Sequence, residues 1–493
     1  LTVAAQKGKN DMTRILFAVV ALAVFPLASR GGETVVRLFV QPMAAPKPAL
    51  KYLLLPEVRE LKPGNPAQYY LRCFAEQRNF FFSKQSVAQR ARYQSMPLAK
   101  LAMEKGRDYG GNALRQADWA ARLNAIDWEM VSRVQSEGME LSLPELGPLR
   151  VLAAALQVRF RIEVAGRRFD DAVRTAKTMF MLARHLGEYP AESANLTGLF
   201  VAGLAVDTLE EMVQQPACPN LYWALTDLAC PLVDMRKGLQ GGCVLVATEF
   251  RPLREDVGMT KEELEKVVSR LSGVMGFGRE QAGREPHGLR ASLAARIKDA
   301  KRVQAARDRL FAERRAVLVG RIAGKETPRA FLSRLLEMSS VKDRIEKYPP
   351  MQVILLDEKR EYEVRRDEGM KLLALAPWRI DALSREERQR GGVGLFVDFL
   401  PHVIEARRAQ ARLEQRLALL RHVEALRLYA AGHNGKLPET LSAIVVPLPT
   451  DPFSGKPFAY KLEGTTAQLR GRPPQGEDKN PIYNIRYEVG IRK

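Results

Sequence analysis

The hydrophobic positions of the chain follow a helical period from residue 66 onward. In "AQYYLRCFAEQRNF", Tyr70, Cys73 and Phe74 fall at i, i+3 and i+4, on one face of a helix. Residues 113–216 continue as amphipathic helices separated by short breaks. Within them, "ADWAARLNAIDWEMVSRVQ" predicts a helix whose apolar stripe consists of Trp119, Leu123, Ile126 and Met130.

A helix, a Gly-centred turn and a second helix are predicted over residues 143–188. Leu152, Leu156 and Phe160 give the first helix its apolar face. Ala172 and Ala176 continue that face after the turn, and their small side chains permit close helix approach. Each such hairpin buries its apolar face only by stacking on a neighbour, which is typical of helical repeats.

The turn sequence "AGRRFDDAV" resembles the turn between the two helices of a tetratricopeptide repeat (TPR). Gly166, Phe169 and Ala172 occupy the positions where that family has Gly, an aromatic residue and Ala. One extra residue separates Gly166 from Phe169, and no period of 34 residues surrounds the turn. The resemblance therefore implies irregular TPR-like hairpins and no regular array.

Residues 93–245 also resemble a group of uncharacterised exported bacterial helical proteins. The resemblance rests on Asp127–Trp128 and on the stretches "LPELGPLR", "GRRFDDA", "LARHLGE" and "PNLYWALTDL". It implies a helical fold and a location in the cell envelope. It brings no known activity.

The pattern becomes more polar and basic after residue 248. Residues 250–345 are predicted to form helices with broad solvated faces, and Thr260 with Glu263 predicts a capping box. A last long helix is expected to begin near Gly394 or Pro401 and to run to Ala431. Its apolar face is formed by Leu413, Leu417, Leu420, Val423 and Leu426.

The last 70 residues change from helical to alternating patterns. Gly432 is suited to end the long helix, and Pro438 is suited to the first turn of a short helix. Asp451–Pro452 predicts a turn, with Gly455 supplying a positive φ. "FAYKL" and "IYNIRYEV" alternate as half-buried strands do, and the second has its apolar face at Tyr483, Ile485, Tyr487 and Val489.

This tail resembles the pseudopilins of the type II secretion system. In that family a long helix ends in a corner, a short helix follows, and a Pro- and Gly-containing turn leads into a small antiparallel sheet. The matching residues are Tyr429, Gly435, Pro438, Asp451, Pro452, Gly455 and Tyr460. The chain lacks the pilin-type leader and the acidic calcium loop, so the resemblance implies a pilin-like module without calcium ligands.

These patterns predict a mainly α protein with irregular TPR-like helical hairpins and a small C-terminal α+β module with an antiparallel sheet. The length of 493 residues suits about two to four domains. The predicted segments are an upstream extension with a signal peptide (1–32), an extended lead-in (33–65), a TPR-like domain (66–248), a basic helical region (249–400) and the long helix with its pilin-like tail (401–493).

The N-terminal sequence has the pattern of an export signal. Met12 is the expected start, Arg14 supplies the positive charge, and residues 15–28 are apolar. Cleavage is expected between Ala28 and Gly32, so that a mature protein would begin near residue 30 in the periplasm or cell envelope. An uncleaved anchor is the alternative, although this stretch is short for a span of ~20 residues. No later segment is apolar enough to predict a transmembrane span.

The formal net charge is +20, and the excess is mostly Arg spread over helical segments. Basic surfaces attract nucleic acid, anionic lipid or acidic polymer. Because no nucleic-acid fold signature accompanies the charge, a highly charged helical surface is the preferred interpretation. Binding of an anionic polymer or nucleic acid through residues 280–330 is the alternative.

Few residues of the chain carry recognisable site chemistry. The five histidines show no metal-ligand spacing and there is no CxxC, so the sequence predicts neither a cofactor nor a metal site. Cys218 and Cys230 are the preferred pair if a disulfide forms, with small buried thiols as the equal alternative. Tyr222 and Trp223 are candidates to line a concave interaction groove, against the more common role of aromatic residues in the core.

The sequence therefore favours a non-enzymatic exported scaffold, or protein-interaction protein, of the bacterial cell envelope. Its partner would be an unidentified envelope protein. An envelope hydrolase with an unrecognised site is one alternative, and a basic-surface binder of anionic polymer or nucleic acid is the other. No residue qualifies as catalytic from the sequence.

Overall fold

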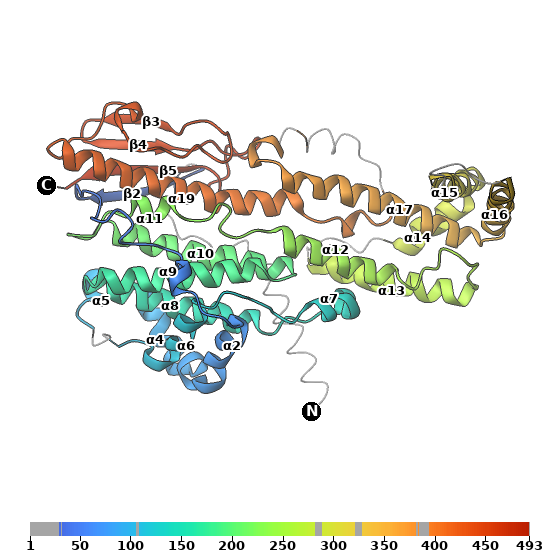
Figure 1. Ribbon diagram of the computed structural model, residues 1–493, viewed down its shortest axis with the longest axis horizontal. Coiled ribbons are helices and arrows are strands. Elements are labelled where there is room, and N and C mark those ends of the chain that lie inside the picture. Colours follow the sequence, from blue (N-terminus) through green and yellow to red (C-terminus); the bar gives the residue numbers. More distant parts are fainter. Residues whose placement is uncertain are drawn as a thin grey trace.

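The computed structural model describes residues 29–30, 32–104, 108–281, 288–320, 328–380, 383 and 394–492. The molecule is mainly helical and elongated, with a small sheet at one end (Figure 1). The long helices run along its length in two neighbouring rows, α10, α12 and α13 in one and α17 and α19 in the other.

Helices occupy most of residues 66–250, as the sequence predicts. Tyr70 and Cys73 are buried on one face of the first of them. The bounds are α2 (Pro66–Glu76), α3 (Arg78–Phe82), α4 (Lys84–Ser95), α5 (Leu98–Leu101), α6 (Gly111–Ala120), α7 (Val131–Glu137), α8 (Leu146–Ala165), α9 (Phe169–Gly187), α10 (Glu192–Met212), α11 (Tyr222–Thr226) and α12 (Arg236–Phe250).

The helix predicted around Trp119 and Met130 is shorter than expected. α6 ends at Ala120, and the chain then pairs with the lead-in through the Arg122 carbonyl and the Asn124 N–H. Lys62 donates its backbone N–H to the carbonyl of Arg122 at 2.8 Å and accepts from Asn124 at 3.1 Å. Trp119 consequently stays on the surface, with 39% of its area exposed.

α8, α9 and α10 form the centre of this region, and each packs against the other two. Ala172 and Ala176 are fully buried in α9, which fits their predicted role in close helix packing. The turn between α8 and α9 differs in one detail from the predicted turn centred on Gly166. Arg167 takes the left-handed conformation, with a φ of 56°, whereas Gly166 has a φ of −82°.

A second group of helices has its own hydrophobic core, which includes Phe250, Tyr362, Phe396 and Phe399. The predicted capping box is present, since Glu263 N–H donates to the Thr260 hydroxyl at 3.2 Å and Thr260 N–H to the Glu263 carboxylate at 2.8 Å. The bounds are α13 (Lys261–Gln281), α14 (Leu289–Lys298), α15 (Ala300–Gly320), α16 (Pro328–Glu346), α17 (Pro350–Met370), η3 (Lys371–Ala374) and η4 (Val397–Phe399).

The tail begins with the long helix α19 (Val403–Gly432), followed by η5 (Leu441–Ala443). The corner after α19 forms at the predicted Gly435, whereas Gly432 does not take the left-handed conformation expected of it. Asn434 and Gly435 have φ values of 55° and 75°, while Gly432 is the last helical residue. The strands of the tail are β3 (Ala459–Glu463), β4 (Thr466–Arg470) and β5 (Ile485–Ile491).

The sheet is mixed, and the prediction of an antiparallel sheet is wrong in this respect. Its strand order is β1-β2-β5-β4-β3, in which β1 (Ser29–Arg30) and β2 (Glu33–Val40) come from the other end of the chain. β2 pairs parallel with β5, from Thr34 opposite Ile485 to Val40 opposite Ile491. The predicted lead-in thus contributes a central strand, because Val36, Leu38 and Val40 alternate with more exposed residues and are buried.

One hydrophobic core joins the first group of helices, α19 and the sheet. Val36 and Leu38 of β2, Leu419 and Leu420 of α19, and Tyr487 of β5 all belong to it. The tail is therefore packed into the body of the protein and is no separate appendage.

Candidate functional site

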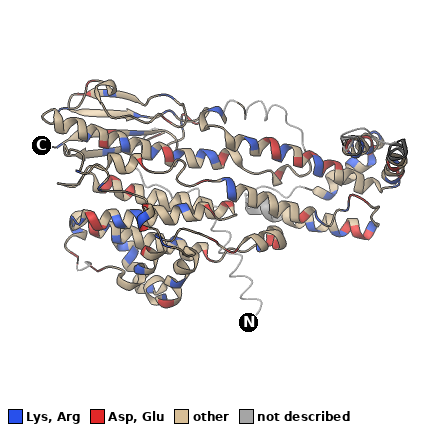
Figure 2. Ribbon diagram, in the orientation of Figure 1, with Lys and Arg blue, Asp and Glu red and all other residues tan. Residues whose placement is uncertain are grey.

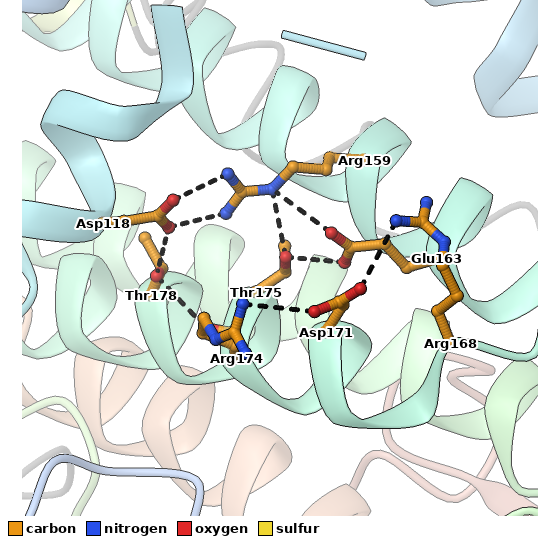
Figure 3. Close-up of polar contacts among 8 residues, drawn as sticks. All are labelled: Asp118, Arg159, Glu163, Arg168, Asp171, Arg174, Thr175 and Thr178. Atoms are coloured by element: carbon orange, nitrogen blue, oxygen red, sulfur yellow. Dashed lines mark hydrogen bonds and ion pairs between the residues drawn. The ribbon is translucent and has the colours of Figure 1, made fainter. Parts of the chain in front are cut away.

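A cluster of charged and hydroxyl side chains lies between α6, α8 and α9 (Figure 3). Arg159 donates to both carboxylate oxygens of Asp118, at 2.8 and 2.6 Å. Thr178 donates to the same carboxylate at 2.8 Å, and Thr175 donates to Glu163 at 2.6 Å. Each carboxylate therefore has both a cation and a hydroxyl near it.

The charges of this cluster balance one another. Burial raises the pKa of Glu163, although Arg159 and the Thr175 hydroxyl act against this shift. Burial also opposes the charge of Arg159, but Asp118 and Glu163 outweigh it and raise the arginine's pKa. The bidentate geometry and the satisfied acceptors are those of a network that fixes three helices together.

A second charged cluster joins α10, α19 and β5. Arg416 of α19 donates to Glu210 at 2.5 Å and lies 2.8 Å from Asp207, both on α10. The hydroxyl of Tyr487 on β5 also donates to Glu210. Burial raises the pKa of Glu210 against the effect of Arg416, and the two carboxylates hold the pKa of Arg416 well above its usual value despite burial.

A third cluster, also on α19, holds the lead-in in place. Arg427 and Glu424 are completely buried and 2.7 Å apart. Arg427 donates to the backbone carbonyls of Gln41 at 3.0 Å and Cys218 at 2.7 Å, while Glu424 accepts from the Leu221 N–H at 2.9 Å. The only sequence signal of these two charges is their position within the apolar face of a long helix.

The proposed groove residues Tyr222 and Trp223 do not line a groove together. Tyr222 is fully buried, its hydroxyl donates to the Pro447 carbonyl, and Arg421 lies 5.4 Å from its ring. Trp223 is half-buried and meets the Tyr222 ring edge to face at 5.0 Å. Tyr222 therefore lies in the core, the more common role of such an aromatic residue, and the tail covers it.

The four cysteines are free thiols, so Cys218 and Cys230 form no disulfide in this structure. Cys218 is buried beside Arg427, and burial raises its pKa to about 12. Cys230 is exposed. Their chemical environments therefore differ, and Cys218 in particular behaves as a small core residue.

The predicted tail motif is brought together as a structural unit centred on Asp451. Its buried carboxylate accepts from Gln415 of α19 at 2.9 Å, from the Arg472 N–H at 2.9 Å and from the Ser454 hydroxyl at 2.9 Å. Pro452 is buried in the same turn. Gly455 closes the turn with a φ of 65° and faces the Trp378 ring.

The other motif residues fix the corner above β3. The Tyr460 hydroxyl donates to the carbonyl of the buried Pro438 at 2.5 Å. Tyr429 stacks on His433, with ring centroids 3.8 Å apart. Gly435 lies between His433 and Pro438 in the chain and has a positive φ of 75° at the corner. All seven motif residues therefore have a structural role at this corner or in the turn before β3.

A small pocket with room for about one water molecule lies in the second core. Tyr362 lines it and is buried, its hydroxyl finds no hydrogen-bond partner among the described residues, and burial raises the pKa of that hydroxyl. Ligand pockets usually have volumes of about 300–1,000 Å³, so this pocket is too small for a substrate. It suits a bound water better than a substrate.

The outer side of β3 is one of the two edges of the sheet, and β1 forms the other. β3 is the last strand in the order, and Figure 1 draws it at the outer side of the sheet. A two-residue turn joins Glu463 to Thr466, with Gly464 at a φ of 60°. In such a hairpin the residues that close the turn exchange hydrogen bonds, and the bonded pairs then alternate along the strands.

This alternation determines which groups of β3 point outward. Glu463, Lys461 and Ala459 bond to β4, so the backbone N–H and C=O groups of Leu462 and Tyr460 point away from the sheet. No hydrogen bond to these outward groups occurs within the described part of the chain. The side chains of Lys461 and Glu463 are exposed on the solvent face.

The described residues hold no group of three or more His, Cys, Asp or Glu side chains that could bind a metal ion. Within the same ranges, no helix has both the length and the apolar character that crossing a membrane requires. Comparison of the chain with family models, with curated proteins and with solved structures finds no match.

Proposed function

We propose that this protein is a non-enzymatic scaffold or protein-interaction protein of the bacterial cell envelope. The observation that carries the proposal is the open edge of β3, where the backbone of Tyr460 and Leu462 can pair with a further strand. The strand is well suited to this, because Tyr460 is fastened to Pro438 and β4 lies in the main core.

The helical hairpins support the same proposal. α8, α9 and α10 pack side by side, which fits the irregular TPR-like architecture that the sequence implies. In the tail, the order of α19, a corner, η5 and the β3–β4–β5 meander is the order that the pseudopilin resemblance implies. Both architectures present surfaces to other proteins.

Export is part of the proposal. Residues 12–28, which carry the signal-like pattern, lie outside the described residues. β2 begins at Glu33, so cleavage anywhere from Ala28 to Gly32 would leave this buried strand whole. Sequencing the N-terminus of the protein purified from an envelope fraction tests this point, and a mature chain that starts at Met12 would contradict it.

The two alternatives, an envelope hydrolase and a binder of anionic polymer or nucleic acid, have less support. The acidic pairs that the fold brings together are bonded to Arg159 and Arg416, as structural networks are. Arginines of the basic region form ion pairs, including Arg309 with Asp357 and Arg314 with Glu255, which reduces the charge available to an anionic polymer. We therefore propose neither a hydrolase nor a polymer-binding role.

Photo-cross-linking in cells tests the proposed function. A photoreactive lysine analogue at Lys461 lies beside the β3 edge, and the same analogue at exposed Lys266 of α13 is the matched control. We expect protein cross-links in the envelope fraction from position 461 and not from 266. Absence of cross-links at 461, or equal cross-linking at both positions, would contradict the proposal.

A further inference from the structure

We propose that the open edge of β3 pairs with β3 of a second copy of this chain. The result would be a two-fold symmetric dimer in which the two sheets join into one continuous sheet. The inference rests on the proposed function and names its partner. It starts from the outward backbone groups of Tyr460 and Leu462 and from the exposed charges beside them.

Backbone geometry leaves few registers for such a pair. Two copies of one strand, related by a two-fold axis, pair antiparallel, and only residues whose N–H and C=O point outward can exchange hydrogen bonds. On β3 these residues are Tyr460 and Leu462. The symmetric registers therefore place Leu462 opposite Leu462, Tyr460 opposite Tyr460, or Tyr460 opposite Leu462.

The exposed charges select among the three registers. With Leu462 at the axis, Lys461 lies opposite Glu463 of the second copy, and Glu463 opposite Lys461, so two opposite-charge pairs form on the solvent face. With Tyr460 opposite Leu462, the two Lys461 side chains would face each other and repel. With Tyr460 at the axis, Lys461 would face the uncharged Ala459.

The side chains of Lys461 and Glu463 are accessible for this contact. Lys461 is 72% exposed and Glu463 is 48% exposed. Within the chain they pair with each other at 2.5 Å, and Gln468 also donates to Glu463 at 2.8 Å. Lysine on an edge strand ordinarily discourages edge pairing. Here Glu463 lies two residues after Lys461, so in one register the lysine of each copy faces a glutamate of the other and is attracted to it.

The contact surface of two five-residue strands is small. Stable dimers usually bury about 1,200–2,000 Å², and a strand pair alone provides less. We therefore expect a weak, concentration-dependent dimer with a Kd in the range of about 10–100 μM. The local concentration that a cell envelope provides would favour such an association.

Charge reversal in the full chain tests the register. Sedimentation equilibrium of the wild type should give a monomer–dimer equilibrium. K461E and E463K each place like charges opposite one another, so each should weaken the dimer at least about tenfold. The double variant K461E/E463K restores both opposite-charge pairs and should restore dimerisation. Unchanged far-UV circular dichroism and melting temperature would show that the variants fold.

A second variant tests the backbone contact. Leu462→Pro removes an N–H that points outward and that the β3–β4 ladder does not use, and edge strands tolerate such a proline. It should abolish the dimer, while Leu462→Val should retain it.

A monomeric wild type up to about 1 mM, single reversals without effect, or a double variant that stays monomeric would each overturn the inference. Cross-linking of Lys461 to a different protein would in that case leave the proposed function standing.

Discussion

Arg416 of α19 and Glu210 of α10 form a buried ion pair, with Nη2 of the arginine 2.5 Å from Oε1 of the glutamate. The hydroxyl of Tyr487 on β5 donates to the same carboxylate. A single acidic side chain thus connects the helical region, the long helix and the sheet. This contact lies where the tail shares one hydrophobic core with the rest of the protein.

Replacing Arg416 with methionine should strongly destabilise the protein. The change leaves Glu210 and Asp207 close together without their cation, and breaking a buried pair in this way costs about 3–5 kcal/mol. The free energy of unfolding from urea titration measures the loss. Arg174→Met is the control, because Arg174 is 58% exposed, and it should cost about 1 kcal/mol or less. Equal losses for the two variants would contradict the account.

Stability should fall in mild acid because of His185. This histidine is buried, with its Nδ1 2.9 Å from the Tyr70 hydroxyl, and burial and nearby Arg184 lower its pKa to about 3. The unfolded chain has the ordinary pKa near 6.5 and takes up the proton first. The stability that neutral His185 contributes is therefore complete above pH 6.5. It is lost as the pH falls toward 3, at up to about 1.36 kcal/mol per pH unit.

His185→Gln isolates this effect. Urea unfolding at pH 7 and pH 5 should show that the wild type loses about 2 kcal/mol more than the variant. The carboxylates titrate in both proteins, and so does His422, whose pKa burial also lowers. Their effects on stability therefore cancel when the two proteins are compared. An equal loss in the two proteins would show that His185 does not titrate as described.

Asp451→Ala should loosen the turn that precedes β3. The change removes the acceptor for Gln415, the Arg472 N–H and the Ser454 hydroxyl, and each buried donor left unpaired costs about 1–3 kcal/mol. Gln415 is the fully buried donor among the three, so we expect a loss of about 1–3 kcal/mol in urea unfolding. Asp478→Ala, at an exposed carboxylate in the same tail, should stay within about 0.5 kcal/mol of the wild type.

The membership of β2 in the sheet can be tested with Leu38, which is 1% exposed. Leu38→Ala should lower the free energy of unfolding by about 2–5 kcal/mol. It should also speed amide exchange in β5, although the paired residues Arg37 and Glu488 are 451 positions apart in the chain. Arg37→Ala, on the exposed face of the same strand, should cost about 1 kcal/mol or less. Unchanged exchange in β5 would argue against the parallel pair.

The sequence predicted the elements that depend on local pattern. The helices, the Thr260–Glu263 capping box and the turn at Asp451 follow from spacing within a few residues. The sheet did not follow, because β2 and β5 pair across nearly the whole chain and no local pattern specifies that partner. The alternation in "ETVVRLFV" is also short, and the proline-rich residues that follow it are typical of an extended lead-in.

The candidate sites show the same division. Asp451 and Tyr460 were found because their motif is local, but the Arg416–Glu210 and Arg427–Glu424 pairs depend on helices that meet only in the fold. The role of Tyr222 stays open at the level of sequence, because an aromatic residue at helical spacing has the same pattern in a core as in a groove. What covers it is a loop of the distant tail, at Pro447.

Hydrogen exchange of individual amides in β3, measured at about 5 μM and about 500 μM protein, tests the central claim most directly. The Lys461 amide, which bonds to β4, should exchange slowly at both concentrations. The Tyr460 and Leu462 amides should exchange rapidly in the dilute sample and slowly in the concentrated one. Protection of these two amides in the dilute sample would show a covered edge, and rapid exchange in both samples would show an edge that finds no partner in a second copy.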